Sequence, residues 1–110
     1  DVILWGSGKP KREFLHVDDL AEAVYFALKN KLDENIYNVG SGVDMTIKDL
    51  SLMISNIVNF KGKIKWDNSM PDGTPRKILD SSKFKKLGWN SKIMINDGLK
   101  NTYSWYKNNV

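Results

Sequence analysis

The chain alternates short apolar runs with longer amphipathic stretches, and Gly-Ser-Gly turns close two of the short runs. Val2–Trp5 ends at Gly6-Ser7-Gly8, and Ile36–Val39 ends at Gly40-Ser41-Gly42. A mostly apolar run this short that stops at a turn is typical of a β-strand. The longer stretches repeat their apolar residues at helical spacing. The sequence therefore predicts the α/β class, as a mixed fold of short strands with about four helices.

The first predicted helix begins at Asp19, because Asp is a favourable N-cap residue and Glu22 follows three positions later, as in a capping box. We expect this helix to follow a short extended run at Phe14–Val17 and to end near Asn30. Its predicted buried face carries Leu20, Val24, Ala27 and Leu28.

The second predicted helix has the clearest start in the chain. Thr46 can cap it, Asp49 occupies the third helical position, and Gly62 follows its end. Lys63–Asp67 then alternates polar and apolar residues, which predicts a half-buried strand. The buried stripe of this helix is predicted at Leu50, Met53, Ile54, Ile57 and Val58.

Two further helices are predicted after a turn-rich loop at residues 68–75. Asp80 can cap a short helix that directs Phe84 and Leu87 inward, and Gly88 can end it in the left-handed conformation. The last helix is predicted from about Ile95 to Asn108, with one face made of Ile95, Leu99, Tyr103 and Tyr106.

The composition excludes several classes of site. The 110 residues suffice for one domain, and no apolar run is long enough to cross a membrane. The absence of Cys excludes disulfides and thiol catalysis, and a single histidine, His16, excludes a His-based metal cluster. We therefore expect no metal and a cytoplasmic location. The net charge of +4 favours an anionic partner, but no basic block is long enough for a nucleic-acid-binding tail.

Three features look like catalytic or cofactor motifs, and we interpret each as structural. Tyr25-x-x-x-Lys29 and Tyr103-x-x-x-Lys107 match a dyad in which lysine lowers the pKa of a catalytic tyrosine, but chance matches are expected in a lysine-rich chain. Gly40-Ser41-Gly42 lacks the third glycine of a dinucleotide-binding turn, since Met45 stands in its place. His16 is interpreted as a packed or hydrogen-bonded side chain.

Two segments indicate recognition of a nucleotide-like anion. In the first, a flexible turn separates Trp5, whose ring can stack on a base, from Arg12, whose guanidinium can grip a diphosphate. In the second, Pro71–Lys77, prolines and a glycine shape a loop that presents Asp72 beside two cations. A carboxylate there can hold a hydroxyl while a cation neutralises phosphate.

Motifs along the whole chain occur in an order that resembles a known family. They are Trp5-Gly-Ser-Gly-x-Pro-x-Arg12-Glu-Phe-Leu-His-Val-Asp-Asp-Leu20, Tyr37-Asn-Val-Gly-Ser-Gly42, Pro71-Asp-Gly-Thr-Pro-Arg-Lys77, Leu87-Gly-Trp89, Gly98-Leu99 and Thr102-Tyr103-x-Trp105. Together they resemble the C-terminal part of the GDP-L-fucose synthases, which are extended short-chain dehydrogenase/reductases. The segment from Pro71 to Lys77 narrows the resemblance to this branch.

The resemblance implies an NADPH-dependent enzyme that epimerises C3 and C5 of GDP-4-keto-6-deoxy-D-mannose and reduces C4, which makes GDP-L-fucose. In the family, the Rossmann domain, the Ser/Tyr/Lys set and the Cys and His for epimerisation precede the matching segment. Residues 1–110 are therefore expected to be a C-terminal substrate-binding domain fragment without the N-terminal Rossmann cofactor domain. We expect this fragment to hold no catalytic and no cofactor-binding residue, to be inactive alone, and to act within a homodimer.

The resemblance also implies site residues. Trp5 contacts the guanine nucleotide, Arg12 contacts its diphosphate, Asp72 is a further substrate contact, and Lys77 is a second cation near GDP. Spacing alone does not decide whether Arg76 or Lys77 is this second cation. Three alternatives stay open: another sugar-nucleotide epimerase or dehydratase, a small basic module that binds nucleic acid or a partner protein, and a structural, dimer-forming fragment.

Overall fold

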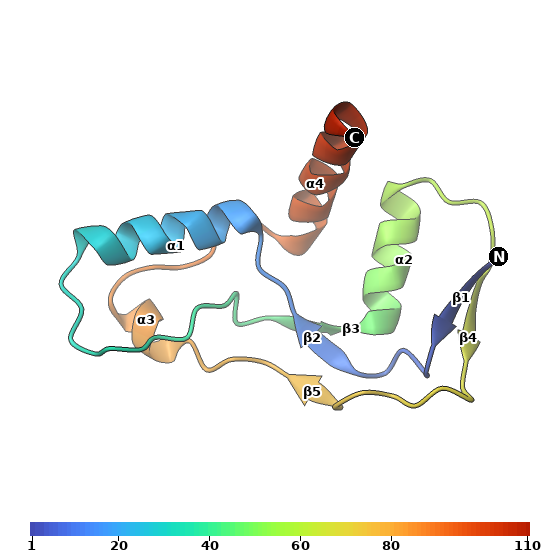
Figure 1. Ribbon diagram of the computed structural model, residues 1–110, viewed down its shortest axis with the longest axis horizontal. Helices are drawn as coiled ribbons and strands as arrows, with labels where there is room; N and C mark the ends of the chain where they lie inside the picture. The colour runs from blue at the N-terminus through green and yellow to red at the C-terminus, as the bar shows by residue number, and fades with distance from the viewer.

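The computed structural model describes residues 1–110 as a mixed α/β chain, which confirms the predicted class. It spans 50 × 34 × 19 Å with a Cα radius of gyration of 16.7 Å (Figure 1). A compact chain of this length has a radius of gyration of about 13 Å, so the elements spread along one axis. In order they are β1 (Val2–Trp5), β2 (Lys11–Glu13), α1 (Val17–Lys29), β3 (Asp44–Thr46), α2 (Ile47–Ile57), β4 (Ile64–Asp67), β5 (Arg76–Lys77), α3 (Ser82–Lys86) and α4 (Ile95–Asn109).

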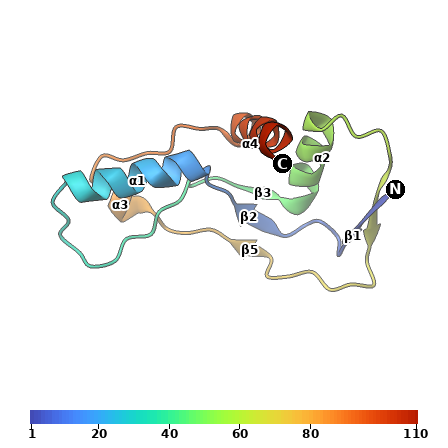
Figure 2. The same cartoon turned by 45° about the horizontal axis from the view of Figure 1, so that its top comes forward.

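The strands form two small sheets. β1 pairs in parallel with β4, so that Trp5 lies opposite Asp67, and both predicted strands are confirmed. β2 is the central strand of the second sheet, between antiparallel β3 and parallel β5. The sequence did not predict β2, β3 or β5, because strands of two or three mostly polar residues carry no apolar alternation. Figure 2 shows α4 and α2 above this second sheet, with α1 beyond its end and next to α3.

The core is small and centres on Phe84 of α3. Phe84 and Ala23 are each 2% exposed, and Trp89 is 4% exposed. The Phe84 ring lies 5.6 Å from the Phe26 ring and 5.5 Å from the Trp89 ring, which are favourable aromatic separations. The inward direction of Phe84 is confirmed, and so is the left-handed stop at Gly88, whose φ is 112°.

Helix α1 begins earlier than the sequence predicts. His16 is its N-cap, and the His16 Nδ1 accepts a hydrogen bond from the Asp18 N–H at 3.1 Å. The prediction of an extended run through Val17 is therefore wrong, as is the N-cap at Asp19. Asp19 lies within the helix and is 1% exposed, and its carboxylate accepts the backbone N–H groups of Lys92 and Ile93 at 3.0–3.2 Å. A tertiary contact has replaced the local cap that the pattern suggested.

The predicted buried face of α1 is largely wrong as well. Leu20, Val24 and Leu28 are 47%, 55% and 82% exposed. The helix instead packs on the core through Ala23, with Phe26 and Ala27 beside it. Both faces of α1 are apolar, and this chain covers only one of them.

The strand predicted at Ile36–Val39 does not form. The segment is extended but lacks a ladder, because no other strand of the chain lies beside it. Its backbone makes no hydrogen bond to the backbone of another segment, and Ile36 is 80% exposed. Propensity alone does not make a strand without a partner.

The remaining helices follow the prediction closely. Thr46 caps α2, since its Oγ1 accepts the Asp49 N–H at 3.0 Å. The N-cap of α3 is Ser81 and not the predicted Asp80, which lies one position earlier and accepts the Ser82 N–H at 3.0 Å. α4 covers the predicted range. No residue of α2 is fully buried, and Tyr106 of α4 is 55% exposed, so both apolar faces are only partly covered. None of the helices is both long and apolar enough to cross a bilayer.

Candidate nucleotide-binding site

The second sheet presents two cations on one face. Arg12 of β2 and Lys77 of β5 are register partners in a parallel ladder, and Met45 of β3 is the register partner of Arg12 on the other side. Register partners direct their side chains to the same face of a sheet. We call the face that carries Arg12, Met45 and Lys77 the cation face. Neither Arg12 nor Lys77 makes an ion pair within the chain, so both charges are available to an anion.

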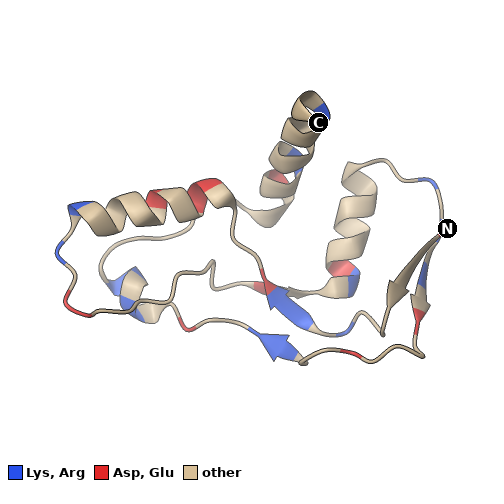
Figure 3. Ribbon diagram, viewed as in Figure 1, with Lys and Arg blue, Asp and Glu red and all other residues tan.

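The opposite face carries Lys11, Asp44 and Arg76, and we call it the ion-pair face. The Arg76 Nε donates to the Asp44 carboxylate at 2.6 Å. This hydrogen bond, with the charges of Arg76 and Lys11, lowers the pKa of Asp44 below its ordinary value. Figure 3 shows basic residues on both β2 and β5. Only on the ion-pair face does an acid, Asp44, neutralise one of them. The structure thus separates Arg76 from Lys77, which spacing alone did not.

The Arg12 guanidinium is anchored by one of its nitrogens. Nη1 donates to the carbonyl oxygens of Lys11 and Thr74, each at 2.7 Å. A Cβ on Gly73 would lie 3.1 Å from Nη2, so the absence of a side chain at position 73 leaves room for the guanidinium. Nε and Nη2 make no hydrogen bond within the chain, which leaves donors for a phosphate or another anion.

Asp72 holds the turn that follows Trp5. Its carboxylate accepts the Ser7 N–H at 2.7 Å and the Ser7 hydroxyl at 2.6 Å. These bonds, led by the hydroxyl and assisted by the charge of Lys9, lower the pKa of Asp72. Gly6 has a φ of 79°, and a Cβ there would collide with the Asp72 carboxylate, so only glycine fits. Two of the four carboxylate lone pairs are used, and the others can accept a ligand hydroxyl.

The loop at residues 71–75 therefore connects the predicted site residues. Asp72 attaches it to the turn after Trp5, and the Thr74 carbonyl attaches it to Arg12. The loop then runs directly into β5, which carries Lys77. Trp5 is 73% exposed at the end of β1, so its ring is available for stacking. No pair among Trp5, Arg12, Asp72 and Lys77 is in direct hydrogen-bond contact.

Sequence reasoning missed two residues that organise this site. Ser7 is the partner of Asp72, and the only signal was its place between two glycines. Glu13 follows Arg12, and its carboxylate accepts the backbone N–H groups of Gly42 at 2.6 Å and Leu79 at 3.2 Å. No local pattern marked Glu13, because its partners lie 29 and 66 positions away.

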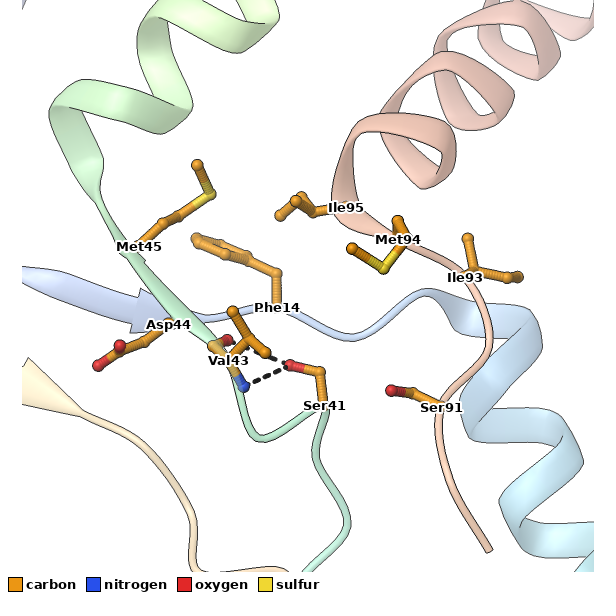
Figure 4. A pocket seen from close by; sticks show the side chains of 9 residues that line it. All are labelled: Phe14, Ser41, Val43, Asp44, Met45, Ser91, Ile93, Met94 and Ile95. Atoms are coloured by element: carbon orange, nitrogen blue, oxygen red, sulfur yellow. Dashed lines mark hydrogen bonds between the residues drawn. The ribbon is translucent and has the colours of Figure 1, made fainter.

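An apolar pocket of about 230 Å³ lies beside the cation face. Phe14 and Met45 point into it from the strand side, and the segment that leads into α4 closes it with Ile93, Met94 and Ile95 (Figure 4). The Asp44 carboxylate points away from these apolar side chains, as expected from strand alternation.

The two Tyr-x-x-x-Lys matches lie on helices. The Lys29 ammonium lies 4.8 Å from the Tyr25 ring centroid, and that of Lys107 lies 5.0 Å from the Tyr103 ring centroid. Both are cation–π contacts between helical neighbours. Tyr25 is 57% exposed.

The Gly40-Ser41-Gly42 turn does not fit a dinucleotide phosphate. The Gly42 N–H is already donated to the Glu13 carboxylate, and the space at Gly40 is filled by the same group. A fixed carboxylate at this point repels phosphate. The structure also brings no group of three His, Asp or Glu side chains together that could hold a metal ion.

Comparisons with known proteins find similar sequences and a similar fold. Residues 1–40 match the NAD dependent epimerase/dehydratase family. The chain is 50% identical over 110 residues to GDP-L-fucose synthase 1 of Arabidopsis thaliana, covering all of this chain and 34% of that protein. It is 45% identical over 118 residues to GDP-L-fucose synthase of Escherichia coli, covering 99% of this chain and 37% of that protein.

A solved structure supports the fold. A GDP-L-fucose synthetase from Naegleria fowleri bound to NADP superposes with a TM-score of 0.90 at 26% identity, over 97% of this chain and 34% of that one. The chain spans about a third of the length of these relatives. It is therefore a homologue of the GDP-L-fucose synthases over that third, and it shares the fold of the extended short-chain dehydrogenase/reductases.

Proposed function

We propose that residues 1–110 are the C-terminal substrate-binding domain of a longer enzyme, called the complete protein below. That enzyme converts GDP-4-keto-6-deoxy-D-mannose to GDP-L-fucose by epimerisation at C3 and C5 and reduction at C4 by NADPH. The names of relatives at 45–50% identity support this reaction. In this proposal the complete protein is a cytoplasmic homodimer, and its N-terminal part is a Rossmann domain.

The observation that carries the proposal is the pair of unneutralised cations on the cation face. Arg12 and Lys77 come from adjacent strands in direct register, and neither has an acidic partner in the chain. A diphosphate carries charge on two neighbouring phosphates, which matches two neighbouring cations. In our proposal Arg12 binds the diphosphate through its free guanidinium donors, and Lys77 supplies the second charge.

Trp5 and Asp72 complete the proposed site. The exposed Trp5 ring can stack on guanine, since planar rings favour offset stacking on bases. The bonds from Ser7 lower the pKa of Asp72, and the carboxylate can accept a hydrogen bond from a hydroxyl of the GDP-sugar while it holds Ser7. The loop at residues 71–75 thus brings the base contact and the phosphate contact together.

The proposed chemistry lies outside this chain. NADPH, when bound, supplies the hydride for the reduction at C4. The residues present here do not fit NADPH, because the one Gly-Ser-Gly turn before a helix is filled by Glu13. This chain therefore binds and orients the GDP-sugar, and we expect the 110-residue chain alone to show no turnover. NADPH oxidation by that chain with the keto-sugar would contradict this part.

Binding competition on the complete protein tests the proposed substrate class. GDP should displace a labelled GDP-sugar more effectively than UDP or dTDP, because the base, and not only the diphosphate, is recognised. Equal displacement by the three nucleotides would assign the chain to a different sugar-nucleotide enzyme. Binding of RNA that falls steeply with salt, without competition by GDP, would favour the basic binding module instead.

A further inference from the structure

Glu13 connects three segments that are far apart in the sequence. It ends β2, and its carboxylate oxygens accept the N–H of Gly42 at 2.6 Å and the N–H of Leu79 at 3.2 Å. Gly42 lies just before β3, and Leu79 lies two residues after the end of β5. One side chain therefore ties the central strand to both of its neighbours.

The ladder between β2 and β5 is too short to fix the strands alone. It contains two register pairs, Lys11 with Arg76 and Arg12 with Lys77. β5 ends at Lys77, and the Glu13 side chain then takes the N–H of Leu79 beyond the end of the ladder. A hydrogen bond to a charged acceptor is stronger than one between neutral groups. Glu13 thus extends the hydrogen bonding between β2 and β5 beyond the pair of Arg12 and Lys77.

Strand alternation keeps the Glu13 charge away from the cation face. Consecutive residues of a strand point to opposite faces, so Arg12 and Glu13 point in opposite directions. The carboxylate can hold the backbone on one side while the guanidinium on the other side faces an anion.

Gly40 provides the space for the Glu13 carboxylate. A Cβ at position 40 would lie 2.7 Å from both carboxylate oxygens, closer than ordinary contacts allow. Gly40 is buried, although it has no need for a left-handed φ. Its lack of a side chain is therefore explained by the carboxylate and not by the turn.

We propose that Glu13 is a positioning residue for diphosphate recognition: it fixes Lys77 relative to Arg12, and Gly40 makes room for its carboxylate. This inference rests on the proposed function, because it needs the cation pair to bind a diphosphate. Glu13 touches no substrate in this account and acts through the two strands that carry the cations.

The test compares GDP with GMP on the complete protein. GDP affinity depends on both cations, whereas GMP lacks the second phosphate. By calorimetry, Glu13→Ala should weaken GDP binding roughly tenfold, since two charge-assisted hydrogen bonds are lost. GMP affinity should change by less than about threefold, because base stacking and one phosphate contact suffice for it. Glu13→Gln should give an intermediate loss, because its amide oxygen can still accept one N–H.

A double-mutant cycle identifies the role of Gly40. Gly40→Ala should weaken GDP binding in the native background but add no loss to Glu13→Ala, because the clashing carboxylate is gone. Glu34→Ala is the matched control, since it removes a carboxylate from an exposed ion pair with Lys83. It should change neither affinity.

Defined outcomes overturn the inference. Equal losses of GDP and GMP affinity in Glu13→Ala would mean general unfolding of the site, and an additive effect of Gly40→Ala would remove the steric link. If Glu13→Ala does not fold, Glu13→Gln and Gly40→Ala make the same comparison. If the native protein does not bind GDP more tightly than GMP, the proposed function fails, and this outcome is distinct from the others.

Discussion

Both faces of the β3-β2-β5 sheet carry basic residues, but only one face pairs a base with an acid. On the ion-pair face, Arg76 is bound to Asp44 at 2.6 Å, and its charge is neutralised within the chain. On the cation face, Arg12 and Lys77 have no acidic partner. Arg76 and Lys77 are neighbours in the sequence, yet alternation along β5 places Arg76 beside Asp44 and leaves Lys77 on the other face without an acidic partner. The difference teaches that the position of the acids, not of the bases, determines which face carries unpaired positive charge.

The largest effect is expected for Arg12→Ala in the complete protein. GDP affinity, measured by calorimetry, should fall roughly 10- to 100-fold, because hydrogen bonds to charged groups contribute most to diphosphate binding. Arg12→Lys should recover only part of the loss, since an ammonium cannot grip two oxygens in a plane. An Arg12→Lys variant with native affinity would show that charge alone matters on this face.

A smaller effect is expected for Lys77→Ala, about five- to tenfold on GDP affinity, because lysine acts as a point charge. The adjacent Arg76→Ala is its matched control and should change GDP affinity by less than about twofold, although it removes the same charge. If Arg76→Ala weakens binding as much as Lys77→Ala, the distinction between the two faces is wrong.

The smallest effect concerns acid stability. Because the hydrogen bond and charge of Arg76 lower the pKa of Asp44 below its ordinary 3.8, ionised Asp44 stabilises the fold above that value. This contribution is lost as the pH falls through 3.8 and below. The melting temperature of the native protein should therefore exceed that of Arg76→Ala at neutral pH, and the gap should narrow below pH 3.8. A gap that does not depend on pH would assign the effect to packing of the Arg76 side chain.

The sequence predicted elements whose signals are local. The cap at Thr46, the inward Phe84 and the stop at Gly88 depend on residues a few positions apart, and all are confirmed. The predictions for Asp19 and for Ile36–Val39 were wrong because the outcome there depends on distant segments of the chain. Asp19 prefers a contact with Lys92 and Ile93 to a local cap, and the extended segment has no partner strand in this chain.

The site followed the same division. Trp5, Arg12, Asp72 and Lys77 were identified from motifs and a resemblance, and their roles stay predictions. The contacts that arrange them could not be predicted, because they join positions 29 to 66 apart, as between Glu13 and Gly42 or between Glu13 and Leu79. Register gave the last distinction, since only the pairing of β2 with β5 shows that Lys77 and not Arg76 faces the same way as Arg12.

The central claim is that the cation face, and not net charge, binds the diphosphate. Two double variants of the complete protein test it most directly, because each removes two positive charges from β2 and β5. Arg12→Ala with Lys77→Ala removes the cation face, and Lys11→Ala with Arg76→Ala removes the bases of the ion-pair face. A calorimetric titration with GDP should detect no binding by the first variant and affinity within about threefold of native for the second. Equal losses in both would contradict the account.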